Sequence, residues 1–206
     1  MRCSKNSVVT RWLKYAAIWS PTSPRFLNTS RHPRTMAMVG SRPQVVLIGP
    51  PASGKTKIGK LVARELVLPF LDTDHIVAGR HGPIPEIFRE HGEKWFRSKE
   101  EEAVAGVLSG PGVVSLGGGA VTTESTRKAL LDHRVVWLDI SPEAVAHRLD
   151  NDKRPLLTGG VEDWKKLVAD REPLYREVAG HRIDVSHRPI DEVASDIVAW
   201  VKAGHD

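Results

Sequence analysis

The chain is poor in cysteine and has no long hydrophobic run. Its 206 residues include one cysteine, Cys3, which excludes an internal disulfide and has no set of zinc ligands around it. A membrane-spanning helix needs about 20 consecutive apolar residues. The longest candidate, residues 12–19, is short and contains Lys14. We therefore expect no zinc site, no disulfide framework and no membrane partner.

Acidic residues are missing from the start of the chain, where the first is Glu65. Eight of the 30 Lys and Arg residues lie within residues 1–44, which leaves 22 basic residues against 25 acidic ones, a net charge of −3, for the remainder. The overall charge of +5 is thus a property of the N-terminal segment. With no basic or aromatic stripe elsewhere, the composition does not favour nucleic-acid binding.

Residues 1–43 are rich in Arg and Ser, and we expect them to form a disordered basic extension. They are interpreted as sequence upstream of a true start at Met36 or Met38, or as an organellar transit peptide. A secretory signal is not favoured, because residues 12–19 make a poor apolar core for one. The folded domain is expected to span residues 44–206. Its expected location is the cytoplasm, or an organelle if the extension is a transit peptide.

From residue 44 onward, short β-branched runs alternate with segments of helical periodicity. Such alternation is typical of an α/β protein, a parallel sheet with helices on both faces. Strands are predicted at residues 44–49, 69–74, 112–116, 134–140 and 181–186. Helices are predicted at residues 54–67, 84–109 with an interruption near Gly92, 141–149 with Ser141 as N-cap, and 189–202.

One stretch breaks this rhythm. Residues 150–162, "DNDKRPLLTGGVE", are polar and rich in turn residues. They are predicted to form either a plain surface loop or a mobile lid, at about residues 150–163, that brings Arg154 over a bound nucleotide.

The first predicted strand leads into "GPPASGKT", residues 49–56, which matches the pattern G-x-x-x-x-G-K-[ST]. The backbone N–H groups of such a loop, together with the N-terminus of the following helix, bind phosphate. Lys55 is expected to reach the β- and γ-phosphates and the Thr56 hydroxyl to bind Mg²⁺. Because the motif follows a strand and opens a helix, it predicts a nucleotide site rather than an ordinary turn.

The second predicted strand ends in two acids, Asp72 and Asp74. Residues two apart on a strand point to the same side, so both carboxylates are expected to face the crevice at the strand's carboxyl end. One would hold the hydration shell of Mg²⁺, and the other would accept or align a hydroxyl proton. The alternative is a strand-end turn with two solvated acids.

Two arginines complete the candidate acceptor site. Arg97 lies in "GEKWFRSKEEE" and Arg171 in "ADREPLYR". A guanidinium group binds a carboxylate through two parallel hydrogen bonds, so a converging pair would suit a small hydroxy acid. Glu100, three residues after Arg97, is placed to hold that guanidinium. Taken singly, each arginine also fits the surface of a helix.

The third predicted strand ends in three glycines, in "SLGGGAV" at residues 115–121. Because glycine loses more conformational entropy on folding than other residues do, three in a row indicate that something must approach the backbone closely. A bound substrate is one such partner, and a flexible joint is the simpler alternative.

These motifs together resemble the shikimate kinase family. The resemblance rests on "GPPASGKT", "LDTD", "IFREHGEKWFR", "VVSLGGGAV", "RPLL" and "REPLYR", which occur in the family's order and spacing over about residues 44–200. It implies a three-layer P-loop kinase fold with a five-stranded parallel sheet in the order 2-3-1-4-5. It also implies ATP-dependent phosphorylation of the 3-hydroxyl of shikimate, on the route to chorismate and the aromatic amino acids, by a protein that is usually monomeric.

The resemblance also implies roles for individual residues. Catalysis would depend on Asp74, Lys55 and Arg154, and the metal would be held by Thr56 directly and by Asp72 through water. Shikimate would contact Asp74, Arg97, Gly117, Gly118, Gly119 and Arg171. ATP would contact Gly49, Ala52, Ser53, Gly54, Lys55, Thr56, Lys57, Arg148, Arg154 and Arg188. No cofactor beyond Mg²⁺ is implied.

Two positions, Ala52 and Lys57, depart from the family's pattern. Many relatives have glycine in place of Ala52, and we expect alanine to be tolerated with a negative φ. Relatives often have a second Ser or Thr in place of Lys57.

The alternative enzyme is another small-molecule kinase such as gluconate kinase. A nucleotide-binding scaffold with an inactive site is the alternative from another class, although no residue of the catalytic set is missing.

Overall fold

The computed structural model describes residues 42–149 and 160–204. All of these residues belong to one compact unit, Met38–Asp206. Over this described part of the chain, no helix is both long enough and apolar enough to cross a membrane. Residues 1–41 of the predicted extension and most of the predicted lid lie outside the described residues, as does Arg154.

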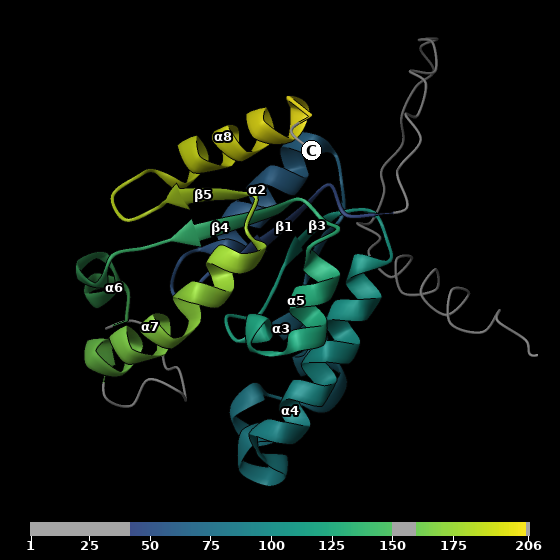
Figure 1. The fold of residues 1–206 in the computed structure, drawn as a ribbon, viewed down its shortest axis with the longest axis vertical. Coiled ribbons are helices and arrows are strands. Elements are labelled where there is room, and N and C mark those ends of the chain that lie inside the picture. The colour runs from purple at the N-terminus through teal and green to yellow at the C-terminus, as the bar shows by residue number, and fades with distance from the viewer. Residues whose placement is uncertain (1–41, 150–159, 205–206) are drawn as a thin grey trace, which may run out of the picture. The chain divides into compact units, whose positions relative to one another are not determined.

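Five parallel strands form one sheet in the order β2-β3-β1-β4-β5 (Figure 1). This is the predicted order. The strands are β1 (Val45–Ile48), β2 (Phe70–Asp72), β3 (Val113–Ser115), β4 (Val135–Asp139) and β5 (His181–Asp184), all within the ranges that the sequence predicts. Every side chain of β1 is buried, because a parallel sheet covered on both faces has no solvent side.

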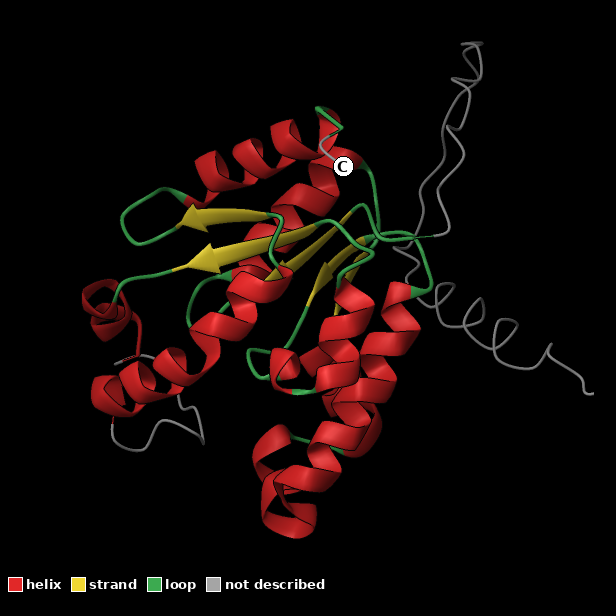
Figure 2. Cartoon of the chain, viewed as in Figure 1, coloured by secondary structure: helices red, strands yellow, loops and turns green. Residues whose placement is uncertain are grey.

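Helices cover both faces of the sheet, as Figure 2 shows with strands in yellow and helices in red. Alternate residues of β1 point to opposite faces. Val45 and Leu47 pack with residues of α2 (Lys55–Leu66) and α8 (Ile190–Lys202). Val46 and Ile48 pack on the other face, with residues of α4 (Ile84–Leu108), α5 (Glu124–Leu130) and α7 (Gly160–Val178). The result is a three-layer α/β fold.

Shorter elements connect these layers. They are α3 (Thr73–His81), the 3-10 helix η1 (Ala120–Thr122) and α6 (Pro142–Leu149). Helices α3 and α4 share a separate apolar cluster of Val77, Ile87, Phe96 and Ala103. As predicted, Ser141 caps α6, with its Oγ accepting a hydrogen bond from the N–H of Ala144 at 3.3 Å. The predicted interruption of α4 is also present, because Gly92 has φ of 78°.

Three local predictions are corrected. The strand predicted at residues 69–74 ends at Asp72, and residues 73–81 form α3, which the sequence pattern did not reveal. Asp74 is therefore a helix residue. Helices α5 and α7 and the 3-10 helix η1 were not predicted either. Residues 160–163, assigned to the predicted lid, form the first turn of α7.

Candidate active site

The loops that carry the predicted site residues leave the sheet side by side. In the strand register, Leu47 of β1 and Asp72 of β2 both lie opposite Ser115 of β3. The chain beyond these three residues forms the phosphate loop (residues 49–56), the start of α3 and the glycine loop (residues 117–119). Because parallel strands end at the same edge, these segments share one crevice, where open α/β sheets bind ligands.

The phosphate loop closes around the side chain of Lys55. Its Nζ donates hydrogen bonds to the carbonyl oxygens of Gly49 and Pro50, both at 2.9 Å. Gly54, with φ of 86°, precedes the first residue of α2 and lets the chain turn into the helix. The N-terminus of α2 is thereby directed at the concave side of the loop, where its dipole favours an anion.

Ala52, within this loop, has φ of 68°, so the expectation of a negative φ is wrong. An L-residue in the left-handed region costs about 1–2 kcal/mol relative to the right-handed one, because its Cβ crowds the backbone. Ala52 is therefore a strained residue.

Thr56 and Asp72 meet beside the phosphate loop. The Thr56 hydroxyl donates to Asp72 Oδ2 at 2.7 Å, and Asp72 Oδ1 accepts from the backbone N–H of His75 at 3.2 Å. Asp72 is the N-cap of α3 as well as the last residue of β2. A hydroxyl and a carboxylate this close provide the oxygen donors that Mg²⁺ prefers.

Asp74 reaches the crevice from the first turn of α3, and not by strand alternation as predicted. A Cβ built on Gly117 would lie 2.5 Å from Asp74 Oδ1, so the carboxylate touches the glycine loop. The glycine loop is also bound to the start of α3, because the N–H of Gly117 donates to Thr73 Oγ1 at 2.9 Å. The expected position of Asp74 in the crevice is thus reached by a different local structure.

Each glycine of the triplet lies against a neighbour that an added Cβ would meet. Gly117 faces Asp74 and Glu100, and a Cβ on Gly119 would collide with the guanidinium nitrogens of Arg97. On Gly118, a Cβ would lie 3.2 Å from Pro51 Cδ of the phosphate loop. The flexible-joint alternative is therefore not needed. The triplet lets charged side chains and the phosphate loop pack directly on its backbone.

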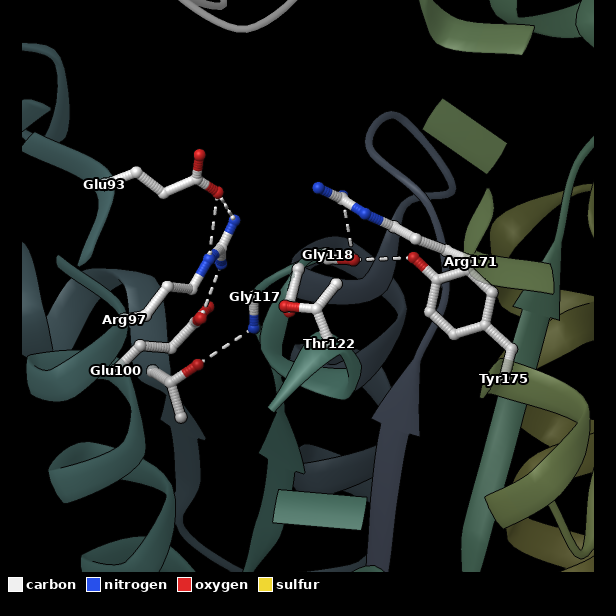
Figure 3. A network of polar contacts seen from close by, with 10 residues as sticks. Glu93, Arg97, Glu100, Gly117, Gly118, Thr122, Arg171 and Tyr175 are labelled. Atoms are coloured by element: carbon white, nitrogen blue, oxygen red, sulfur yellow. Dashed lines mark hydrogen bonds and ion pairs between the residues drawn. The ribbon is translucent and has the colours of Figure 1, made fainter. Parts of the chain in front are cut away.

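Arg97 is held by two carboxylates of its own helix, α4 (Figure 3). Its Nη1 donates to Glu100 Oε2 at 2.6 Å, the contact that the sequence predicts, and its Nη2 donates to Glu93 Oε1 at 3.0 Å. The Arg97 side chain is 15% exposed. It is therefore neither a free surface charge nor fully buried, and it is oriented toward the glycine loop.

Glu100 is the most deeply buried acid near the crevice, at 2% exposure. Burial raises its pKa, which the neighbouring charge of Arg97 opposes and that of Asp74 reinforces. Among the described residues, its Oε1 has no hydrogen-bond partner. A buried carboxylate oxygen without a partner is costly, so the arrangement favours a donor, from a ligand or from water, at this point beside Gly117.

Arg171 and Tyr175 approach the glycine loop from helix α7 (Figure 3). Arg171 Nη1 donates to the carbonyl oxygen of Gly118 at 3.1 Å, and the Tyr175 hydroxyl donates to the same atom at 2.6 Å. Arg171 and Thr122 also line an open hollow of about 450 Å³. The structure therefore places two guanidinium groups, from α4 and α7, at the one glycine loop.

Comparison with known proteins decides the family. The protein-family model described as shikimate kinase matches residues 51–202 of this chain. The chain is 46% identical over 166 residues to the shikimate kinase of Mycobacterium avium (strain 104), a match that covers 78% of this chain and 94% of that protein. The chain belongs to the shikimate kinase family. Its fold also matches shikimate kinase from Acinetobacter baumannii in complex with shikimate, with a TM-score of 0.74, 32% identity, and coverage of 80% and 95% of the two chains.

The alternative enzyme has weaker support. A gluconokinase from Sinorhizobium meliloti 1021 matches with a TM-score of 0.50 and 21% identity, over 79% of this chain and 93% of that one. At this identity the likeness shows the fold alone. Membership of the shikimate kinase family therefore stands on sequence and structure, and the gluconate alternative stands on the shared fold.

The remaining predicted nucleotide residues of this shikimate kinase family member are placed as follows. Ser53 is buried in the phosphate loop and Lys57 is exposed on α2. Arg148 belongs to α6. Arg188 lies between β5 and α8, with its Nη2 2.8 Å from Asp196 Oδ2. The structure thus gives Arg188 an exposed ion pair.

Three contacts of the site were not foreseen from the sequence. They are the Thr73 hydroxyl under Gly117, the Tyr175 hydroxyl on Gly118, and Trp164, whose Nε1 donates to the Pro51 carbonyl at 3.0 Å. Aromatic residues on an amphipathic helix are typical of a core, so periodicity gave no hint of hydrogen bonds to loops. In the sequence, the one indication of a role for Tyr175 was its position inside the motif "REPLYR".

Proposed function

We propose that this protein transfers the γ-phosphoryl group of ATP to the 3-hydroxyl of shikimate, giving shikimate 3-phosphate on the route to chorismate and the aromatic amino acids. The observation that carries the proposal is the meeting of two loops. Gly118 packs on Pro51 of the phosphate loop, while its carbonyl oxygen binds Arg171 and Tyr175. A phosphate donor and a carboxylate-bearing acceptor would therefore lie next to each other.

The nucleotide end uses the phosphate loop and its metal ligands. Lys55 binds the β- and γ-phosphates, and the backbone of residues 49–56, with Lys57, Arg148, Arg154 and Arg188, contacts the rest of ATP. The Thr56 hydroxyl would hold Mg²⁺ directly and Asp72, whose Oδ2 lies 2.7 Å from that hydroxyl, would hold its water shell. Bound there, the ion would supply positive charge beside the phosphoryl oxygens. A hydroxyl and a carboxylate are oxygen donors of the type that Mg²⁺ requires.

The acceptor end binds an acid that carries hydroxyl groups. Arg97 and Arg171 bind the carboxylate, each with N–H donors beyond those used in the contacts described above. The backbone of Gly117, Gly118 and Gly119 contacts the ring hydroxyls. Asp74, beside Gly117, orients the reacting hydroxyl and accepts its proton. Arg154 stabilises the transferring phosphoryl group.

Little covalent chemistry is required of the side chains. Phosphoryl transfer depends mainly on alignment of the acceptor oxygen and on neutralisation of charge on the phosphoryl oxygens. Lys55 and the arginines neutralise charge, and Asp74 aligns the acceptor. We further propose that the enzyme works as a monomer in the cytoplasm, with ATP and shikimate as its partners.

A coupled assay with ATP and Mg²⁺ tests this proposal. Shikimate is expected to be phosphorylated and gluconate to be left unchanged at equal concentration. Phosphorylation of gluconate alone would establish the alternative enzyme. Binding of ATP without turnover of either acid would instead indicate a nucleotide-binding scaffold.

The role of Asp74 is tested by Asp74→Asn. Loss of the proton acceptor is expected to lower kcat by about 100-fold or more, while ATP binding, measured by titration calorimetry, stays unchanged. Asp191→Asn, an exposed acid at the start of α8, is the matched control and should retain full activity. A fully active Asp74→Asn variant would remove the assigned role.

A further inference from the structure

Tyr175 is a buried polar residue to which the proposed chemistry gives no role. Its side chain is 1% exposed, and its hydroxyl donates to the carbonyl oxygen of Gly118 at 2.6 Å (Figure 3). Burial raises the pKa of Tyr175 to about 12. At neutral pH the hydroxyl therefore keeps its proton and remains a donor, and it does not serve as an acid or a base.

The ring of Tyr175 is fixed from behind. It stacks on Trp137 of β4, with the ring centroids 5.8 Å apart and the planes inclined by 28°. Both residues belong to the apolar cluster between the sheet and α7. A tyrosine side chain has only two rotatable bonds, so a ring held in this way also fixes the position of its hydroxyl.

Arg171 donates to the same carbonyl oxygen. Its Nη1 lies 3.1 Å from the oxygen of Gly118, and its Cα lies four residues before that of Tyr175, so both side chains extend from one face of α7. A carbonyl oxygen has two lone pairs, and these two donors use both. The carbonyl oxygen of Gly118 is therefore an anchor for Arg171, and it has no lone pair left for a substrate hydroxyl.

The orientation of this carbonyl also sets the next amide. In a planar trans peptide the C=O of Gly118 and the N–H of Gly119 point in opposite directions, and the described residues contain no cis peptide bond. Because the C=O points to α7, the N–H of Gly119 points away from α7. Figure 3 shows Arg97 on that side of the glycine loop and Arg171 on the other.

We propose that Tyr175 is a positioning residue for the acid site, acting through the carbonyl of Gly118. Its hydroxyl holds that peptide group in one orientation, and so places both the guanidinium of Arg171 and the N–H of Gly119 before the substrate binds. This inference rests on the proposed roles of Arg171 and the glycine loop. It adds to them a residue that need not touch either substrate.

Tyr175→Phe tests the inference, because it removes one oxygen atom and keeps the ring on Trp137. The KM for shikimate is expected to increase about fivefold, within the range of roughly 2- to 12-fold that one hydrogen bond contributes. The kcat and the KM for ATP are expected to change by less than about twofold, since the lost contact supports ground state and transition state equally. An unchanged KM for shikimate, or an equal rise in both KM values, would overturn the inference.

A double-mutant cycle with Arg171→Ala separates this inference from the proposed function. Arg171→Ala alone should raise the KM for shikimate, and if it does not, the proposed role of Arg171 is wrong. In the Arg171→Ala background, Tyr175→Phe should have less effect than in the wild type, because the guanidinium that it positions is gone and only the N–H of Gly119 remains to be placed. Equal effects in both backgrounds would overturn the inference and leave the role of Arg171 intact.

Two further measurements guard against a merely structural effect. Val178→Ala removes packing from the same helix at a residue that makes no side-chain hydrogen bond to the loop. It should lower the melting temperature while leaving the KM for shikimate unchanged.

The chain has two tyrosines, Tyr15 and Tyr175, so 3-fluorotyrosine labelling gives two ¹⁹F signals without any substitution. The Tyr175 signal should shift with shikimate and not with ADP. A Tyr175 signal insensitive to shikimate would contradict the inference.

Discussion

At the scale of single residues, charged side chains pack directly against the backbone of the glycine loop. Asp74 and Glu100 occupy the space that a side chain at position 117 would need, and Arg97 occupies that of position 119. Two acids and one arginine are thus held within contact of bare backbone. A side chain added at position 117 or 119 would displace a charged group of the site, so we expect substitution at these two positions to affect the acceptor before it affects the nucleotide.

Ala52→Gly is expected to stabilise the protein. Glycine adopts the positive φ at this position without the crowding that alanine suffers, so the free energy of unfolding should rise by about 0.5–1 kcal/mol. Urea denaturation measures the change. The same substitution at the exposed helical residue Ala199 of α8 is the control and should lower stability by about 1 kcal/mol. A loss of stability in Ala52→Gly would show that φ at this position is not a source of strain.

Glu100→Gln is expected to change the dependence of stability on pH. The pKa of Glu100 is raised in the folded protein, chiefly by burial, so its contribution is fully present below the unfolded pKa and is lost as pH rises through the folded one. Relative to Glu100→Gln, the wild type should therefore lose stability as pH rises above about 4, the ordinary pKa of a glutamate in the unfolded chain. Urea denaturation at a series of pH values from about 4 upward measures the difference. A wild type that gains on the variant as pH rises would contradict the assignment.

At the scale of elements, α7 connects the two halves of the site. Trp164 binds the phosphate loop through the Pro51 carbonyl, and Arg171 and Tyr175 bind the glycine loop through the Gly118 carbonyl. These three residues are separated by seven and four positions, which places them on one face of the helix. A shift of α7 would thus move contacts to both loops.

Trp164→Phe tests the connection to the nucleotide. It removes the hydrogen bond to Pro51 and part of a side chain that is 1% exposed, so the phosphate loop should be less well fixed. The KM for ATP is expected to increase about threefold, as for loss of one hydrogen bond, and more than the KM for shikimate. Trp200→Phe, where the ring stacks on His181, is the control. Equal KM values for ATP in both variants would contradict this role of Trp164.

The sequence predicts these elements unevenly, for physical reasons. The five strands and the phosphate loop are local patterns, since a buried run such as "VVLI" followed by a glycine and two prolines has few other conformations. Helix α3 was missed because its start overlaps the second strand, and Asp72 is at once strand end and helix cap. Asp74 was predicted to face the crevice by strand alternation, whereas it reaches the crevice from the first turn of α3. The bonds of Tyr175 and Trp164 depend on loops more than 50 residues away, which no periodicity reveals.

At the scale of the whole molecule, the catalytic unit is expected to begin near Met38. The compact unit starts there and the family match covers residues 51–202. Among the residues that the structure describes, the first backbone hydrogen bond to the sheet region joins the N–H of Gln44 to the carbonyl of Gly112 at 2.9 Å. Residues from Met38 onward therefore contain every group assigned to the site.

A chain that starts at Met38 is expected to keep the kcat, both KM values and the melting temperature of the full chain. It removes most of the basic N-terminal segment and no contact described for the site. Steady-state kinetics and thermal unfolding of the two proteins measure the comparison. A shortened chain that folds but has lost activity would show that the N-terminal segment takes part in the reaction.

The central claim is that an acid binds through its carboxylate to guanidinium groups at the glycine loop, beside the phosphate loop. Titration calorimetry with shikimate and with its methyl ester tests this claim most directly, in the wild type and in Arg171→Ala. The ester should bind wild type at least about tenfold more weakly, because charge-assisted hydrogen bonds are lost, and the difference should shrink in Arg171→Ala. Equal affinity of the wild type for acid and ester would contradict the claim.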